Sequence, residues 1–120
     1  MLDIEINLNK YNTEKVLQAE LDYQHMLILD YIYEAIQTKK LTIQKDEQGR
    51  THYVISLPVL TNSIKDIKSS SDNVLRKVKN LHNKEFLTLR MGKFNDPIFG
   101  YTRTAIKLNR KFLNLLDKNI

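Results

Sequence analysis

The sequence feature that most constrains the fold is a dense apolar stretch that runs from Met26 to Ile36. Drawn as a helix, this stretch is apolar around most of its circumference, so the helix must lie in the middle of a hydrophobic core. The apolar pattern extends upstream to Val16, with Thr13 as the predicted N-cap. The helix either continues through Leu21–Asp22 or breaks there into two pieces.

Length and composition favour one compact domain over residues 1–120. Hydrophobic residues make up 42% of the chain and charged residues 28%, which suits a single core. The absence of cysteine excludes disulfides, zinc fingers, iron–sulfur sites and thiol nucleophiles. The sequence has no apolar run of membrane-spanning length, and its N-terminus alternates acidic and apolar residues, unlike a signal peptide. We therefore expect a cytoplasmic protein without a membrane partner.

Shorter elements are predicted on both sides of the apolar helix. In the N-terminal arm 1–12, the alternation from Leu2 to Leu8 predicts a strand. Strand-forming residues on either side of the turn cluster Asp46–Gly49 predict a hairpin between Leu41 and Ile55.

Two short helices should follow this hairpin. Ser56 is the predicted cap of the first, which has Pro58 in its first turn and a break after it at Asp66–Lys68. Ser69 is the predicted cap of the second, with Asp72 three residues later, as in a capping box. The positions expected to face the core are Leu57, Leu60, Ile64 and Ile67 in the first helix, and Val74, Leu75, Val78 and Leu81 in the second.

The C-terminal part predicts another hairpin and a final helix. Strand-like runs at 86–91 and 101–108 flank a long tip at 92–100. Asn109 is the predicted cap of an amphipathic helix over 109–120. The predicted fold class is α+β.

Charge is distributed unevenly along the chain. Residues 1–64 contain six Lys and Arg against nine Asp and Glu, a net charge of −3. Residues 65–120 contain 13 against five, a net charge of +8. Such an asymmetry indicates a polyanionic partner for the C-terminal half, although surface lysines that only maintain solubility would produce a similar pattern.

The order helix, strand, helix, tight turn, helix and β-hairpin resembles the winged helix-turn-helix superfamily. Val74, Val78 and Leu81 have the spacing of the inner face of a recognition helix, and Phe86–Leu87 then enters the wing strand. The chain departs from the family pattern in a longer turn between the two helices, and in lacking the usual helix-ending glycine near Lys84–Glu85. The resemblance implies a helix bundle with a β-hairpin wing, an extra hairpin and a C-terminal helix, and it implies a non-enzymatic DNA-binding protein.

In that superfamily the N-terminal part of the second helix meets base edges in the major groove. A step of 100° per residue places Asn73, Arg76, Asn80 and Asn83 opposite the inner face, with Lys77 and Lys79 at its flanks. Arginine suits guanine, asparagine suits adenine and lysine suits phosphate. Any solvated helix face can be polar, so the prediction depends on the position of this helix after a matching first one. The predicted DNA-contacting residues are Ser70, Ser71, Asn73, Arg76, Lys77, Asn80 and Lys84.

The predicted wing supplies a second DNA contact. Arg90, Lys93 and Arg103 flank the hairpin and are expected to meet an adjacent minor groove or the DNA backbone. The tip also carries three apolar side chains that favour a contact with the core or with another protein equally well: Phe94, Ile98 and Phe99. If about eight cations neutralise phosphates, log affinity should fall against log salt concentration with a slope of about −6 to −7.

The sequence favours no enzymatic chemistry. His25, His52 and His82 fall in three different predicted elements without metal-ligand spacing, and the chain has no phosphate-binding glycine loop. We therefore expect no catalytic residue, no metal and no cofactor.

A looser resemblance, over Met26 to Leu87, is to the N-terminal winged-helix domains of replication initiators from Gram-positive plasmids and related mobile elements. Those domains place a polar hairpin such as Asp46–Tyr53 between an aliphatic, tyrosine-containing helix and the helix-turn-helix. This implies a replication-associated or regulatory factor that binds double-stranded or single-stranded DNA, with a replication enzyme as partner. One alternative is a dimeric transcriptional regulator on a palindromic operator, with Leu2–Leu8 or Phe112–Ile120 as its dimer surface. Another is a protein-interaction adaptor within a larger replication complex.

Overall fold

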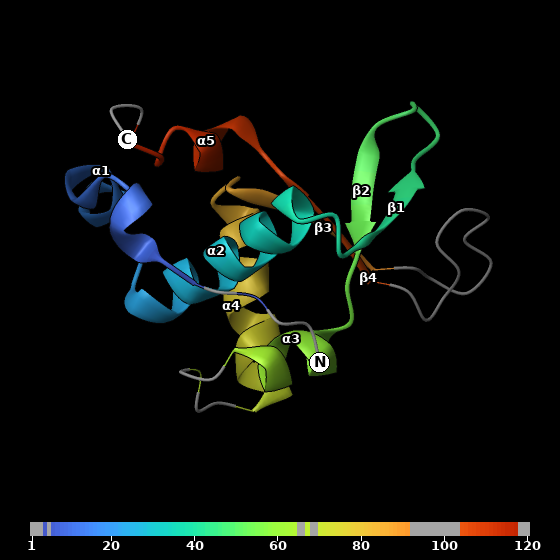
Figure 1. Ribbon diagram of the computed structural model, residues 1–120, viewed down its shortest axis with the longest axis horizontal. Helices are drawn as coiled ribbons and strands as arrows, with labels where there is room; N and C mark the ends of the chain where they lie inside the picture. Colours follow the sequence, from blue (N-terminus) through green and yellow to red (C-terminus); the bar gives the residue numbers. More distant parts are fainter. Residues whose placement is uncertain (1–3, 5, 65–66, 68–69, 92–103, 118–120) are drawn as a thin grey trace.

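The computed structural model describes residues 4, 6–64, 67, 70–91 and 104–117. These residues form an α+β fold, as predicted, in which helices pack against an antiparallel sheet (Figure 1). No helix in the described part of the chain is both long enough and apolar enough to span a bilayer. In chain order the elements are a 3₁₀ helix at Leu8–Lys10, α1 Thr13–Gln18, α2 Tyr23–Gln37, β1 Thr42–Lys45, β2 Thr51–Val54, α3 Leu57–Ser63, α4 Ser71–Asn83, β3 Leu87–Met91, β4 Thr104–Leu108 and α5 Arg110–Leu113.

Helix α2 lies at the centre of the core, which confirms the prediction from its apolar stretch. Its residues from His25 to Ile32 are all buried. The chain does break before it, because Asp22 caps α2 in a reciprocal capping box: the Asp22 carboxylate accepts from the His25 backbone N–H at 2.7 Å, and His25 Nδ1 accepts from the Asp22 N–H at 3.1 Å. The predicted Thr13 cap is wrong by one residue. Asn12 has the extended backbone of a cap, and its side chain accepts from the Lys15 N–H at 3.0 Å.

Three helices are followed by a residue in the left-handed conformation that is not glycine. Glu20, Lys39 and Glu85 have φ of 57°, 57° and 70°, and they follow α1, α2 and α4. After α4, the Phe86 N–H donates to the Leu81 carbonyl and the Glu85 N–H to the His82 carbonyl, both at 3.0 Å, which is the Schellman pattern. The helix therefore ends where the family resemblance places a glycine, although a glutamate occupies the position.

The sheet contains both predicted hairpins, in the order β1-β2-β4-β3. Tyr53 and Leu89 both pair with Ile106, so these side chains share the face that packs toward the core. In the first hairpin, Gly49 has φ of 77° after the turn, as expected when a hairpin turn is followed by a left-handed residue. The predicted tip at 92–100, with Lys93, Phe94, Ile98 and Phe99, and also Arg103, lies outside the described residues.

Two predictions for the chain ends are wrong. The predicted strand at Leu2–Leu8 is absent from its described residues, where the chain instead enters the 3₁₀ helix at Leu8. The predicted helix over 109–120 stops after Leu113, because the chain then pairs with the N-terminal segment: the Asn12 N–H donates to the Leu115 carbonyl at 2.8 Å, and the Asp117 N–H donates to the Lys10 carbonyl at 2.7 Å. Residues 118–120 lie outside the described part.

A buried carboxylate on α2 holds this N-terminal segment in place. The Asp30 side chain is fully buried and accepts hydrogen bonds from the Tyr11 hydroxyl, from Lys10 Nζ at 2.9 Å and from the Asn7 N–H at 3.1 Å. Burial and the neighbouring Asp30 carboxylate raise the pKa of Tyr11 well above its usual range. The Tyr11 ring also packs edge-on against Phe112, with 5.8 Å between ring centroids, so this contact connects the N-terminal segment to α5.

We expect Tyr11→Phe to lower the free energy of unfolding by about 1 to 2 kcal/mol, because it removes a donor from a buried carboxylate. Tyr31→Phe is the matched control. The Tyr31 hydroxyl is buried and has no hydrogen-bond partner among the described residues, so its removal should be neutral or stabilising. Urea denaturation of the two variants tests this, and equal losses would contradict it.

Lys39→Gly should raise the free energy of unfolding by up to about 1 kcal/mol, because glycine adopts the left-handed conformation without a Cβ penalty. Gly49→Ala should lower it by about 1 kcal/mol. A Cβ at position 49 would meet nothing within 4 Å, so the left-handed φ is the source of the cost. Urea denaturation measures both changes in the free energy of unfolding. If Gly49→Ala raised this free energy, the left-handed φ at position 49 would be contradicted.

Candidate nucleic-acid interface

Helix α4 presents an apolar face to the core and a polar face away from it. Val74, Val78 and Leu81 are buried, as predicted, while Leu75 is half-buried. The predicted cap at Ser69 is wrong by one residue. Ser70 is the cap, and its Oγ accepts from the Asn73 N–H at 3.3 Å, so this predicted contact residue already has a structural role. The side chain of Ser71 lies outside the described part.

The exposed polar side chains of α4 include Asp72, Asn80 and His82 and four others, which are Asn73, Arg76, Lys79 and Asn83. Within the described part of the chain, none of these four side chains forms a hydrogen bond or an ion pair. They therefore remain available to an external ligand. Arg76 and Lys79 contribute two positive charges to this face, and the exposed Asp72, one turn before Arg76, contributes a negative charge.

Two of the predicted contact residues face a different way, toward the junction between α1 and α2. Lys77 Nζ lies 2.7 Å from Asp22 Oδ2, so its charge is neutralised by the cap of α2. Lys84 Nζ donates to the carbonyl oxygens of Ala19 and Glu20 at 3.2 and 3.3 Å, where α1 ends. Both lysines stabilise the packing of α4 against the junction, and each is less available to a phosphate.

The buried imidazole of His25 lies at the same junction. Burial lowers the pKa of His25, and the positive charges of Lys77 and Lys84 add to this effect, while Asp22 opposes it. The Asn80 side chain also interacts with His25. Asn80 is exposed, so it lies at the boundary between the junction and the polar face of α4.

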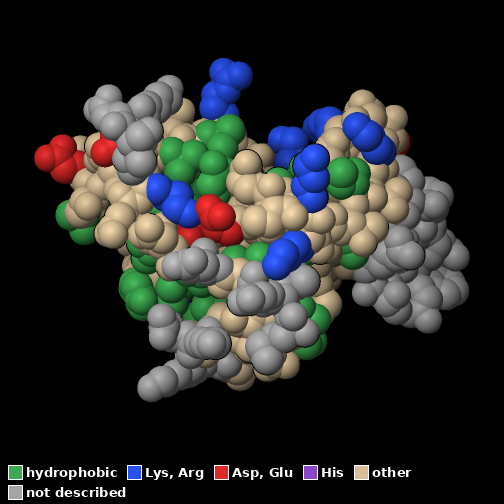
Figure 2. All heavy atoms as spheres, viewed as in Figure 1, with side chains coloured by type: hydrophobic (Ala, Val, Ile, Leu, Met, Phe, Trp, Pro, Cys, Tyr) green, Lys and Arg blue, Asp and Glu red, His purple; other side chains and the backbone are tan. Residues whose placement is uncertain are grey.

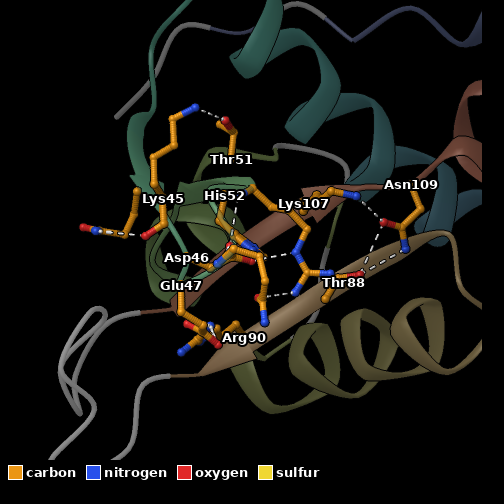
Figure 3. Close-up of polar contacts among 12 residues, drawn as sticks. Lys45, Asp46, Glu47, Thr51, His52, Thr88, Arg90, Lys107 and Asn109 are labelled. Atoms are coloured by element: carbon orange, nitrogen blue, oxygen red, sulfur yellow. Dashed lines mark hydrogen bonds and ion pairs between the residues drawn. The ribbon is translucent and has the colours of Figure 1, made fainter.

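The outer face of the sheet carries a further polar network (Figure 3). Arg90 of β3 reaches Glu47 in the turn of the first hairpin, with 3.0 Å between Nη1 and Oε2. Of the three predicted wing cations, Arg90 is thus already paired within the molecule. Lys93 and Arg103 are not among the described residues.

Asp46 organises this turn. Its buried carboxylate accepts from the N–H groups of Gln48 and Arg50 and from Arg50 Nε, each at 2.9 Å, and it lies 2.9 Å from His52 Nε2. Burial alone would raise the pKa of Asp46, but the hydrogen bonds from His52, Arg50 and Gln48 hold it well below the usual range.

A groove of about 630 Å³ lies beside the C-terminal end of α4 and adds cations that the sequence analysis missed. The Arg110 side chain is exposed and makes no hydrogen bond or ion pair with the described residues. Lys111 donates to the Lys84 carbonyl at 2.7 Å and lies over the Phe86 ring, 4.7 Å from its centroid. The groove is lined by His82, Asn83, Glu85, Leu87, Thr88, Asn109, Arg110 and Lys111.

The helical period predicted that Lys77 and Lys79 both flank the polar face of α4, but only the Lys79 side chain is available to an external ligand. The difference depends on Asp22, which is remote in sequence and carries no local signal of its position beside α4. Arg110 likewise joins this surface only because α5 packs next to the end of α4. Asn83 was placed on the correct face by the helical period.

Comparisons with protein-family models, with curated proteins and with solved structures found no match. Among the described residues, no three His, Asp or Glu side chains gather in a way that could hold a metal ion. The functional proposal therefore depends on the geometry of α4 and on the charge distribution.

Asp46→Asn should flatten the dependence of stability on pH at acidic values. A carboxylate with a lowered pKa in the folded state contributes stability above its unfolded pKa, near 3.9, and this is lost as pH falls through the folded pKa. The variant should therefore be less stable than the natural chain at pH 7 and should lose less further stability between about pH 5 and pH 2. Urea denaturation across this range measures the effect, and parallel pH profiles would refute the role of Asp46.

Proposed function

We propose that this chain is a DNA-binding protein of the winged helix-turn-helix type. In this proposal α3 and α4 form the helix-turn-helix, and the hairpin of β3 and β4 is the wing. Support comes from the packing of α3 against α4, from the direct entry of the chain into β3, and from the net charge of +8 in residues 65–120. The observation that carries the proposal is the outward face of α4, where the cations Arg76 and Lys79 and two asparagines have no partner among the described residues.

In the proposed complex, α4 lies in the major groove of a DNA duplex. Arg76 is placed to pair with a guanine edge, and Asn73 near the N-terminus of α4 with an adenine. Lys79 and Arg110 contact phosphates on either side of the helix. Lys77 and Lys84 hold α4 against the α1–α2 junction and so fix the angle at which the helix is presented.

We further propose that the protein acts in replication or regulation of a mobile element, as the looser resemblance implies. A dimeric regulator would need a twofold surface, which the sequence analysis placed at Leu2–Leu8 or Phe112–Ile120. All described apolar residues of both segments except Leu113, which is 46% exposed, pack against the protein's own core, and Phe112 is fully buried. This packing leaves less surface for a dimer contact and favours a factor that binds DNA as one copy.

Lys79→Gln and Lys77→Gln provide a matched test, because each removes one lysine charge from the same helix. We expect Lys79→Gln to weaken DNA binding and to reduce the salt slope by about one, since it removes a phosphate contact. Lys77→Gln should lower stability by up to about 1 kcal/mol and change binding less. Arg76→Gln should weaken binding by about 1 to 3 kcal/mol.

Fluorescence anisotropy with a duplex oligonucleotide over a salt series measures all three variants. With about four to six phosphate contacts, the natural chain should show a slope of about −4 to −5, shallower than the sequence analysis predicted. The proposal fails if the natural chain does not bind duplex DNA, or if Arg76→Gln and Lys79→Gln bind as well as it does while circular dichroism is unchanged.

A further inference from the structure

A second concave surface lies between the C-terminal end of α2, β2 and α5. It encloses about 330 Å³, which is at the lower end of the range of ligand pockets. The described residues that line it include no acid. They are Tyr33, Ile36, Gln37, Arg50, Thr51, Tyr53, Lys107, Leu108 and Leu113.

The groove is apolar inside and exposes a leucine beside it. Leu113 is 46% exposed, although the adjacent Phe112 is fully buried and already anchors α5 to the core. Ile36 and Leu108 pack against the core only in part. Aliphatic side chains that line a concave site in this way suit the insertion of an apolar side chain from a partner.

Positive charge surrounds this apolar groove. Arg50 and Lys107 are part of its lining. Arg50 pairs with Asp46, with 2.9 Å between Nε and Oδ2, while its side chain stays 60% exposed, and Lys107 Nζ donates to the uncharged Asn109 side chain at 3.2 Å. Figure 2 shows further Lys and Arg side chains gathered over the C-terminal end of α2 and the first hairpin. The nearby acids are already engaged: Glu34 pairs with Lys10, and the buried Asp46 pairs with Arg50. A ligand that fits this surface therefore has an apolar group that enters the groove and negative charges on either side of that group.

We propose that this groove binds an acidic segment of a partner protein, which inserts one apolar side chain of Leu or Phe size. Single-stranded DNA would also bring negative charge, but it binds by stacking bases on open aromatic faces. The Tyr33 ring is not open in this way, because Phe112 packs against it with centroids 5.5 Å apart and Lys10 Nζ lies 5.6 Å from its centroid. Tyr53 is the one lining ring without a ring contact among the described residues, whereas the aliphatic side chains of Ile36, Leu108 and Leu113 suit an apolar protein side chain.

This surface is distinct from the polar face of α4, but both border the short helix α5, which contributes Arg110 to the proposed DNA contact and Leu113 to the groove. Helix α4 contacts α2 through the core, so its free polar face points away from α2 and from the groove. The inference does not rest on DNA binding. It gives the adaptor hypothesis a defined surface.

Titration of the ¹⁵N-labelled protein with a short synthetic peptide tests the proposal. The peptide has a central Phe flanked by Asp and Glu, and a second peptide has Ala in place of Phe. We expect amide shifts centred on Ile36, Tyr53 and Leu113 with the Phe peptide, and at least about tenfold weaker binding of the Ala peptide. Leu113→Glu should weaken binding of the Phe peptide by about tenfold or more. Leu17→Glu, which alters a leucine that is 69% exposed on α1, should leave binding unchanged.

Circular dichroism checks that the variants fold, and Leu113→Ala serves as a second variant that only shortens the exposed side chain. The proposal is overturned if the peptide shifts no groove residues, if both peptides bind equally, or if Leu17→Glu matches Leu113→Glu. It is also overturned if oligo(dT) shifts the same residues with higher affinity, which would make single-stranded DNA the occupant. A dimer in solution that Leu113→Glu dissociates would assign the groove to a second copy.

Discussion

The structure depends on how one buried charge is satisfied. Asp30 lies in the middle of α2, and an unpaired carboxylate there would cost several kcal/mol. Its partners come from the segment of residues 7–11, which is therefore held across α2. That segment then offers its backbone to residues 115–117, so the two ends of the chain are joined over the central helix. Asp30 thus holds residues 7–11 directly and residues 115–117 through them.

A second carboxylate, Asp22, connects the core to the candidate interface. Its Oδ1 caps α2, and its Oδ2 pairs with Lys77 of α4. The same group that begins the central helix therefore also pairs with α4, whose rotation about its axis is set by the burial of Val74, Val78 and Leu81. That rotation decides which of the α4 lysines face outward, so the composition of the polar face is a tertiary property.

The sequence predicts the parts of the fold that follow from hydrophobic periodicity. The buried helix, both hairpins and the inner face of α4 were correct because Val74, Val78 and Leu81 repeat at the helical period and because turn residues such as Gly49 separate the strands. The predictions for the two chain ends were wrong because an alternating or amphipathic pattern is equally compatible with an irregular segment that packs on a core. Three of the predicted contact cations, Lys77, Lys84 and Arg90, are already engaged within the molecule. Their partners Asp22, Ala19 and Glu47 are remote in sequence, so no local pattern could reveal them.

The imidazole of His82 has a consequence for how the sheet meets other molecules. Its Nδ1 accepts from the Leu89 N–H of β3 at 3.0 Å, so a side chain of α4 occupies a donor that an incoming strand would use. A strand edge covered in this way resists pairing with other chains for as long as α4 keeps its position. Any ligand that displaced α4 along β3 would therefore also uncover a site for strand addition. The helix that is proposed to contact DNA therefore also covers part of the β3 edge of the sheet.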